Sequence, residues 1–295
     1  MLRVLFVIWL CALALFAQAT PAPTTNVTVV ASVEPLAAAM RQVFAEAPHI
    51  QVHTLLLPNQ HPHHASLTPG QAKLIHQADL FVWMGPDAEP HLKPFSERYA
   101  QRELTMTAQE NIQRLYEEGH HASEHQHAHL DPHLWLSPTN VLALVRGLGQ
   151  HLEPLGLTDE AWQQAEQRFV AAMEATTIAL TASLAPYSAV PYLSHHDAWG
   201  YFAESFSLQR PLIVSANVEG EASSRQLIVL NREMKRQNIR CVMAEPESRK
   251  ALLQRLCTGD CKLHQVDPLG RNEKAQWYTD FLLNVGEQFK ACLAH

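Results

Sequence analysis

The sequence of 295 residues lacks features that would place it in several common functional classes. It has no basic run or basic face, and its 29 acidic residues outnumber its 22 lysines and arginines, which argues against nucleic acid as a partner. It has no second long apolar stretch after the N-terminal one, so we expect the mature protein to be soluble. It also lacks the H-E-x-x-H motif, the familiar signature of one large class of metallopeptidases.

The first 19 residues have the organisation of an export signal. Arg3 supplies one positive charge, Leu2 to Phe16 form a short apolar run, and Ala17-Gln18-Ala19 matches an A-x-A cleavage site. A retained membrane anchor is the alternative, but the run is too short to span a bilayer stably. We therefore expect residues 1–19 to be removed. Loss of Arg3 takes the formal net charge from −7 to −8 in an exported chain of about 276 residues.

Four cysteines remain in the mature chain: Cys241, Cys257, Cys261 and Cys292. An even number in an exported protein favours disulfides, and four cysteines allow three pairings. Cys257 and Cys261 flank a short loop that can close on itself, which leaves Cys241, on a predicted strand, for Cys292, near the end of the last predicted helix. The alternative is a C-x3-C metal site, against which oxidation in an exporting compartment competes.

Predicted strands and helices alternate along the chain in two groups, which is typical of α/β folds with mostly parallel sheets. The first group, within residues 20–156, has strands predicted at 27–31, 52–57, 80–84 and, more weakly, 103–107, and helices at 35–44, 69–76 and 138–152. The second group, within residues 187–295, has strands predicted at 191–194, 211–214, 240–244 and 263–266, and helices at 202–206, 223–237 and 273–293. The pattern predicts two βα lobes.

One long helix is predicted between the two groups, over residues 157–186. Thr158 is a good N-cap, and no glycine or proline follows until Pro186. Apolar and small residues recur at three- and four-residue spacing, as expected for one buried helix face: Trp162, Ala165, Phe169, Met173, Thr176 and Leu180. About 27 residues at about 1.5 Å each give a rod of roughly 40 Å. We therefore predict an α/β fold in which a backbone helix joins two lobes.

The 18 histidines include three groups near predicted strand-to-helix turns: Pro62-His63-His64, Asp131-Pro132-His133 and His195-His196-Asp197. Open α/β sheets bind ligands at the carboxyl ends of their strands. Asp267 ends the last predicted strand, so all four places can line one cleft between the lobes. Neutral imidazole suits borderline metals such as zinc. We predict a metal site made by His63, His133, His196 and Asp267, with water as the alternative to Asp267.

Neighbouring residues leave alternatives open at this site. His61, His64 and His195 could replace the adjacent histidines as ligands, because spacing alone does not exclude them. Asp131 and Asp197 are better explained as turn formers or as carboxylates that orient imidazoles. Glu245 ends another predicted strand and is expected to face the cleft without binding the metal.

Residues 117–129 form a polar segment rich in glutamate and histidine. Such a composition predicts an exposed loop. Its functional interpretation is weak auxiliary metal capture, and the alternative is a solvated loop without a role. The histidines concerned are His120, His121, His125, His127 and His129.

Five motifs together give the chain a specific resemblance to a known family. The chain resembles the substrate-binding components of zinc ABC importers, the ZnuA type within the cluster of metal-binding receptors. The motifs occur in the order of that family and cover nearly the whole mature chain. They are Pro62-His63-His64-Ala65-Ser66-Leu67 with Thr68-Pro69, Asp131-Pro132-His133-Leu134-Trp135, His196-Asp197-Ala198-Trp199-Gly200-Tyr201-Phe202, Ala244-Glu245-Pro246 and Asp267-Pro268-Leu269-Gly270.

The resemblance implies two α/β lobes joined by a long helix, with the metal in the cleft between them. It implies His63, His133 and His196 as ligands, with Asp267 nearby or bound, and matches the acidic, histidine-rich loop of zinc members to the shorter segment before Asp131. The pairing of Cys241 with Cys292 is similar to that of enterobacterial zinc receptors. It further implies a periplasmic protein of Gram-negative cells that binds Zn2+ as cargo, serves an inner-membrane ABC permease and has no enzymatic activity. We expect it to be a monomer.

The chain departs from the family pattern beside the first ligand. Pro62 stands where several relatives have an acidic residue, which weakens a carboxylate role there, and His61 stands where many have Asp. Manganese members tend to carry a carboxylate at the third ligand, where this chain has His196. Because harder cations prefer oxygen, zinc is favoured over manganese.

Three rival functions remain at this stage. A manganese or iron receptor would share the architecture. An exported zinc hydrolase could use the same three histidines with an open fourth position and Glu245 as its base. A surface adhesin could be built on the same fold, but a free chain cleaved after an A-x-A site favours the periplasm.

Overall fold

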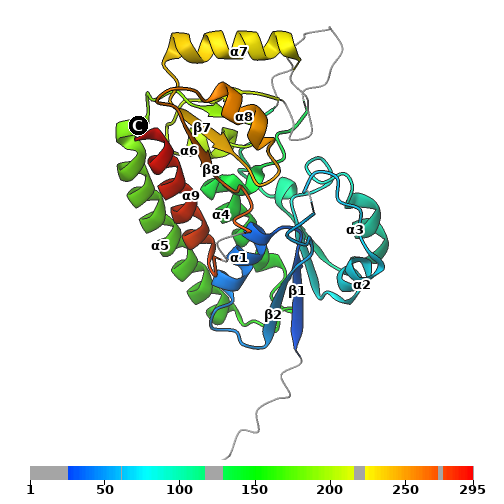
Figure 1. Cartoon of the computed structure of the whole chain (residues 1–295). Coiled ribbons are helices and arrows are strands. Elements are labelled where there is room, and N and C mark those ends of the chain that lie inside the picture. The colour runs from blue at the N-terminus through cyan, green and yellow to red at the C-terminus, as the bar shows by residue number, and fades with distance from the viewer. Residues whose placement is uncertain (1–25, 61, 117–128, 216–222, 272–274, 295) are drawn as a thin grey trace, which may run out of the picture.

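The computed structural model describes residues 26–60, 62–116, 129–215, 223–271 and 275–294 (Figure 1). The predicted signal segment lies outside the described residues. So do His61 and most of the histidine-rich segment, of which only His129 is described.

Two four-stranded parallel sheets form the two lobes, as the alternation of strands and helices predicted. The N-terminal sheet has the order β2-β1-β3-β4, and the C-terminal sheet has the corresponding order β6-β5-β7-β8. The first comprises β1 (Val27–Ala31), β2 (Ile50–Thr54), β3 (Leu80–Trp83) and β4 (Glu103–Thr105). The second comprises β5 (Leu193–Ser194), β6 (Leu212–Ile213), β7 (Cys241–Ala244) and β8 (Lys262–Gln265). β1, β3 and β7 consist almost entirely of buried apolar residues, as expected of parallel strands covered on both faces.

Nine α-helices connect and cover these strands in the described part of the chain. They are α1 (Glu34–Val43), α2 (Pro69–Gln77), α3 (Lys93–Tyr99), α4 (Pro138–Gly147), α5 (Asp159–Leu184), α6 (Gly200–Ser205), α7 (Ser224–Gln237), α8 (Lys250–Leu256) and α9 (Tyr278–Leu293). The sequence did not predict α3 and α8, which have seven residues each. The helix expected from residue 273 begins at Tyr278.

Local sequence explains where the helices that flank the site begin. The side chain of Thr68 accepts a hydrogen bond from the Gln71 backbone N–H, and Gln71 reaches back in a capping box that starts α2. Ser137 caps α4 through the backbone N–H of Asn140. Both caps lie a few residues after a candidate ligand. The capped helix starts therefore help to fix the loops that carry His63 and His133.

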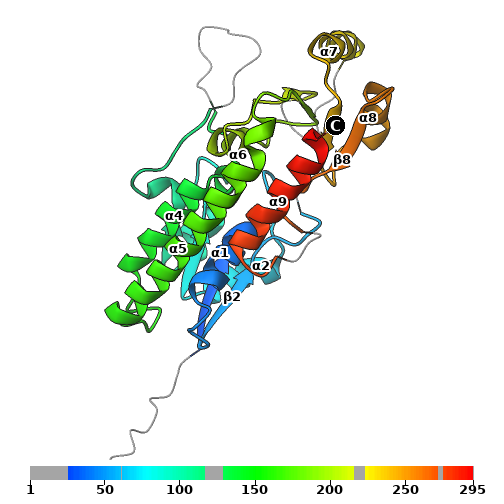
Figure 2. The same cartoon turned by 90° about the vertical axis from the view of Figure 1, so that its left-hand side faces the viewer.

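The long helix α5 joins the lobes and forms a layer with α1, α4 and α9. Thr158 caps it through the backbone N–H of Ala161 at 3.2 Å, and its buried face is the predicted stripe, extended by Leu184. Figure 2 shows α5 and α9 lying side by side along this layer. Gly286 of α9 permits their close approach, because a Cβ atom there would lie 2.2 Å from Cδ2 of Leu180. The predicted fold class is confirmed.

One continuous apolar core extends through this helical layer and into both lobes. It includes residues of β1 and α1, of α4 and α5, and of α9. Among the described residues, only the segment Asp159–Tyr187 is long and apolar enough to cross a membrane by length and composition. The buried face of this helix packs against α4 and α9.

Two disulfides lie in the C-terminal lobe. Cys241 of β7 is joined to Cys292 of α9, with 5.2 Å between their Cα atoms, and Cys257 is joined to Cys261 directly after α8. The first therefore ties the last helix to the central part of the second sheet, and the cysteines of the second are not available as thiolate ligands.

Candidate metal centre

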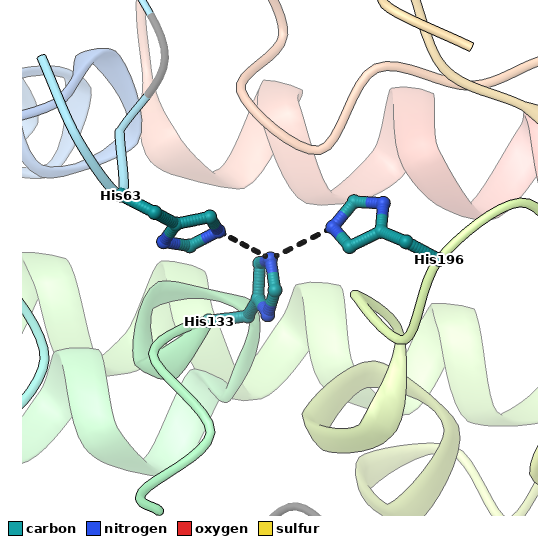
Figure 3. Close-up of side chains that lie close together, drawn as sticks. All are labelled: His63, His133 and His196. Carbon is teal, nitrogen blue, oxygen red and sulfur yellow. Dashed lines mark hydrogen bonds between the residues drawn. The ribbon is translucent and has the colours of Figure 1, made fainter. Parts of the chain in front are cut away.

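Three loops from separate parts of the chain bring their histidines to one point. His63 lies between β2 and α2, His133 lies between β4 and α4, and His196 follows β5. Two of these loops belong to the N-terminal sheet and one to the C-terminal sheet. Figure 3 shows the three imidazole rings converging, with His133 between the other two. The site therefore lies where the two lobes meet.

Nε2 of His133 faces Nε2 of the other two histidines at distances suited to a shared metal ion. Nε2 of His133 lies 3.1 Å from that of His63 and 3.3 Å from that of His196, and the potential ligand atoms of all three residues lie within 4.8 Å of one another. A zinc ion at about 2.0–2.1 Å from each nitrogen would hold tetrahedral ligands roughly 3.3 Å apart. Throughout the described residues, no other group of three histidine, cysteine or acidic side chains meets this criterion.

Asp131 orients the central imidazole. Its Oδ1 lies 2.8 Å from Nδ1 of His133 and also accepts the His133 backbone N–H at 3.0 Å. Burial raises the pKa of Asp131 to about 7, although the hydrogen bond from the His133 backbone and the charges of Arg210 and His196 oppose that rise. An acceptor at Nδ1 favours the tautomer that keeps its proton there, which leaves the lone pair of Nε2 free for a metal.

Glu245 lies behind the third imidazole as its ion-pair partner. Its Oε1 lies 2.6 Å from Nδ1 of His196, and both side chains are almost fully buried. Burial opposes the charged imidazolium, but the charge and hydrogen bonding of Glu245 outweigh it and raise the pKa of His196. Burial also raises the pKa of Glu245 itself, although the charge and hydrogen bond of His196 oppose that rise. The carboxylate lies on the side of the ring away from the site and so orients Nε2 toward the other two histidines.

His63 is the most exposed of the three. Its ring meets that of His133 edge to face, with 4.8 Å between the centroids. It is half-buried, whereas His133 and His196 are each only 3% exposed. Two of the candidate ligands are thus buried, and the third lies at the more exposed edge of the site.

Asp267 is not part of this group. Its carboxylate accepts hydrogen bonds from the backbone N–H groups of Leu269 and Arg271 and forms an ion pair with the Arg271 guanidinium at 3.0 Å. The structure therefore brings together the three predicted histidines, whereas the predicted carboxylate of Asp267 is paired with the guanidinium of Arg271.

The neighbouring residues that the sequence left as alternatives lie outside the group. His64 is exposed, and His195 is fully buried. Burial, together with the charges of His196 and Arg249, lowers the pKa of His195 to about 4. Asp197 lies 3.9 Å from Arg210. His61, His120, His121, His125 and His127 lie outside the described residues, and His129 is exposed.

The sequence did not identify the contacts that tie the His133 loop to the C-terminal lobe. Trp135 donates its Nε1–H to the carbonyl of Pro268 at 2.7 Å, and the Tyr278 hydroxyl donates to the carbonyl of Trp135 at 2.7 Å. Neither contact has a local sequence signal, because each joins residues more than 130 positions apart. Arg271 was also missed, and its spacing of four residues from Asp267 was the one available hint.

Comparison with known proteins gives a consistent result. The family described as "Zinc-uptake complex component A periplasmic" matches residues 29–292. The high-affinity zinc uptake system protein ZnuA of Yersinia pestis is 25% identical over 93% of this chain and 94% of its own length.

Solved structures share the fold. A crystal structure of ZnuA superposes with a TM-score of 0.76 at 21% identity, covering 91% of this chain and 99% of that one. A manganese-bound S38A mutant of a periplasmic metal-binding protein from Candidatus Liberibacter asiaticus has a TM-score of 0.71 at 18% identity, covering 90% and 99%. A zinc-bound deletion mutant of ZnuA superposes with a TM-score of 0.75, so the same architecture occurs in proteins solved with zinc and with manganese.

Proposed function

Because the chain belongs to the family of periplasmic zinc-uptake components, we propose that it is a receptor that captures Zn2+ between its two lobes and delivers it to an ABC importer. The observation that carries this proposal is the convergence of three imidazole nitrogens from three loops, all within 4.8 Å of one another. In this proposal His63, His133 and His196 are the ligands. The ion is cargo, so it must be bound tightly but reversibly.

The donor set supports zinc over manganese. Three neutral nitrogens suit a borderline cation, whereas Mn2+ and other harder cations prefer carboxylate, carbonyl and water oxygens. Zinc takes four ligands in tetrahedral sites, and three histidines leave one position for a fourth ligand. That position is open to a water molecule, or to Asp267 if its carboxylate moves away from Arg271.

The surroundings of the site favour binding over catalysis. A zinc hydrolase needs a general base free to act on metal-bound water. Glu245, the carboxylate that the sequence offered for that role, lies 2.6 Å from Nδ1 of His196, on the far side of the ring. Its position supports a role in orienting the ligand.

The remaining parts of the proposal concern cellular context. We propose that the chain acts as a periplasmic monomer after removal of residues 1–19, and that its partner is an inner-membrane permease. His120, His121, His125, His127 and His129 would provide auxiliary capture. Deleting residues 117–129 should then reduce the number of weakly bound ions and leave the affinity of the central site unchanged.

The decisive experiment is zinc titration by competition with a chromophoric chelator, in protein that lacks residues 117–129. Replacement of His133 by Ala should weaken zinc binding at least 100-fold, because it removes the central ligand. His76→Ala is the matched control, since it removes an exposed imidazole of α2 that lies outside the group. Unchanged high-affinity binding after replacement of all three ligands by Ala would refute the proposal.

Metal titration separates zinc from the manganese alternative. Because N and O sites generally bind Zn2+ more tightly than Mn2+, loss of Mn2+ to equimolar Zn2+ is expected of either receptor, and Mn2+ must also be titrated alone. Three imidazoles without a protein carboxylate should bind Mn2+ only weakly, and tight binding of Mn2+ in the absence of zinc would instead identify a manganese receptor with this architecture.

A further inference from the structure

Arg271 forms a buried set of contacts beside the metal centre. Its side chain is only 8% exposed, and it forms ion pairs with two carboxylates, Asp267 and Glu247. Burial alone would lower the pKa of Arg271, but its hydrogen bonds to Glu247 and Asp267 raise it above the ordinary value. The guanidinium is therefore a permanent positive charge.

Arg271 and the neighbouring backbone occupy both oxygens of Asp267. Oδ1 accepts hydrogen bonds from the Leu269 backbone and from Nη2 of Arg271, each at 3.0 Å. Oδ2 accepts from the backbone N–H of Arg271 at 2.8 Å and from its Nε at 3.1 Å. A carboxylate held in this way has little remaining capacity to act as a metal ligand.

The segment that carries Asp267 contacts the loop of one candidate ligand. The next residue, Pro268, accepts the indole N–H of Trp135, which is two positions after His133. The charge of Asp267 also contributes to the raised pKa of Glu245, the partner of His196. The Asp267 carboxylate is thus near the residues that surround the metal centre, but it is paired with the Arg271 guanidinium.

The same guanidinium contacts the N-terminal lobe. Nη1 of Arg271 donates to the carbonyl of Pro58 at 3.3 Å, and Pro58 lies in the loop that continues to His63. Arg271 therefore joins the segment after β8 to the loop that supplies the N-terminal ligand. Its position is set by contacts on both sides of the cleft.

We propose that Arg271 determines metal specificity by holding the Asp267 carboxylate away from the metal, so that the site presents three imidazoles and no protein oxygen. This inference rests on the proposed function and concerns the same site. With Arg271 in place, Zn2+ retains its preferred nitrogen ligands. Harder cations such as Mn2+ lack the carboxylate oxygen that would favour them.

Removal of the Arg271 guanidinium should free the Asp267 carboxylate to act as a metal ligand. Asp267 is 6% exposed and would be left beside Glu245 and Glu247 without a neutralising cation. An unpaired buried charge is strongly unfavourable, and a divalent metal ion within reach would relieve it. Because a carboxylate ligand benefits Mn2+ more than Zn2+, the ratio of the two affinities should change.

The test compares the Zn2+ and Mn2+ affinities of wild-type protein, Arg271→Leu and Arg271→Leu/Asp267→Asn. We expect Arg271→Leu to strengthen Mn2+ binding at least tenfold and to change Zn2+ binding much less, and we expect the double variant to lose the gain. The visible absorption of Co2+-loaded protein should change in Arg271→Leu and return in the double variant. An unchanged ratio of affinities in a folded Arg271→Leu variant would overturn the proposal.

Arg41→Leu is the matched control. Arg41 and Arg271 both line a cavity of about 440 Å³ between the lobes, and Arg41 likewise joins them, through the carbonyl of Gln276 at 3.3 Å. Its carboxylate partner is Glu34, which is not among the carboxylates at the metal centre. This variant should leave the ratio of the two affinities unchanged, and an equal change in both variants would show that cavity lining alone is responsible.

Asp267→Asn in the wild-type background keeps the proposal testable if Arg271→Leu fails to fold. We expect Zn2+ affinity within threefold of wild type, because Asp267 is not a ligand while Arg271 is present. A loss of tenfold or more would overturn the proposal. The proposed function would survive that result, since it fails only if the histidine variants retain zinc.

Discussion

Glu245 and His196 are held together at 2.6 Å, from Oε1 to Nδ1, in the interior of the protein. Asp131 and His133 repeat the relationship at 2.8 Å on the other side of the cleft. A carboxylate behind an imidazole fixes the ring and makes its second nitrogen more basic, which strengthens a bond to metal. Each lobe therefore supplies an imidazole that is already oriented for binding.

Replacement of Glu245 by Gln should weaken zinc binding about 10- to 100-fold, the range typical for loss of a carboxylate behind a histidine ligand. The amide keeps the shape of the side chain but removes its charge. Competition titration at pH 7.5 measures the effect. Glu97→Gln is a suitable control, because Glu97 is an exposed carboxylate of α3 that pairs with Lys93 and lies outside the group of three histidines. Equal affinities for Glu245→Gln and wild type would contradict the role assigned to this pair.

Zinc affinity should fall as the pH decreases from 8 to 6. Nε2 must be free of its proton to bind metal, and the raised pKa of His196 means that this proton is retained at higher pH than in an ordinary imidazole. Asp131, whose pKa is about 7, becomes neutral over the same interval, which weakens its charged hydrogen bond to Nδ1 of His133. Both effects weaken binding in acid, so we expect a loss of at least tenfold.

Calorimetry in two buffers of different ionisation enthalpy would measure the protons released on binding. Glu245→Gln should move the acid loss to lower pH, because it removes the charge that raises the pKa of His196. An affinity that stays constant between about pH 5.5 and 7.5 would argue against imidazole ligation.

The sequence predicted the fold better than it predicted the arrangement around the site. β1 was predicted with the bounds that the structure has, because its β-branched run is an unambiguous local signal. The long helix was recognisable from Thr158 and the apolar spacing that follows. Order along the chain also placed the three histidine loops at the carboxyl ends of strands, where parallel sheets bring side chains together.

The choice between adjacent histidines depended on geometry. His195 and His196 directly follow β5, and consecutive side chains on an extended backbone point in opposite directions. Only one of them can therefore face the cleft, and the sequence does not say which. The ion pair between Asp267 and Arg271 escaped prediction for a related reason. A carboxylate at a strand end has the same local sequence whether its partner is a metal or a guanidinium.

The two disulfides should contribute unequally to stability. A disulfide stabilises chiefly by restricting the unfolded chain, so its contribution grows with the number of residues that it encloses. Cys241 and Cys292 are 51 positions apart, which corresponds to about 4 kcal/mol of unfolding free energy, whereas Cys257 and Cys261 are 4 apart, for which the same relation gives about 2 kcal/mol. Urea unfolding of the two Cys→Ala double variants measures the difference. A larger loss on removal of the Cys257–Cys261 bond would contradict this ranking.

Zinc should stabilise the folded protein, because the three histidines form a binding site only when the two lobes are folded together. A ligand that binds only the native state at 1,000 times its Kd adds about 4 kcal/mol to the unfolding free energy. For a chain of this size that amount corresponds to an increase in Tm of roughly 10 °C. The His133→Ala variant should show little increase in Tm, and a chelator should abolish the increase in wild type.

The measurement requires a buffered zinc concentration. The unfolded chain also contains many histidines that bind zinc weakly, so excess metal would reduce the gain in stability. An undiminished gain in His133→Ala would mean that the stabilising ion sits elsewhere, and the three-histidine site would no longer explain high-affinity binding.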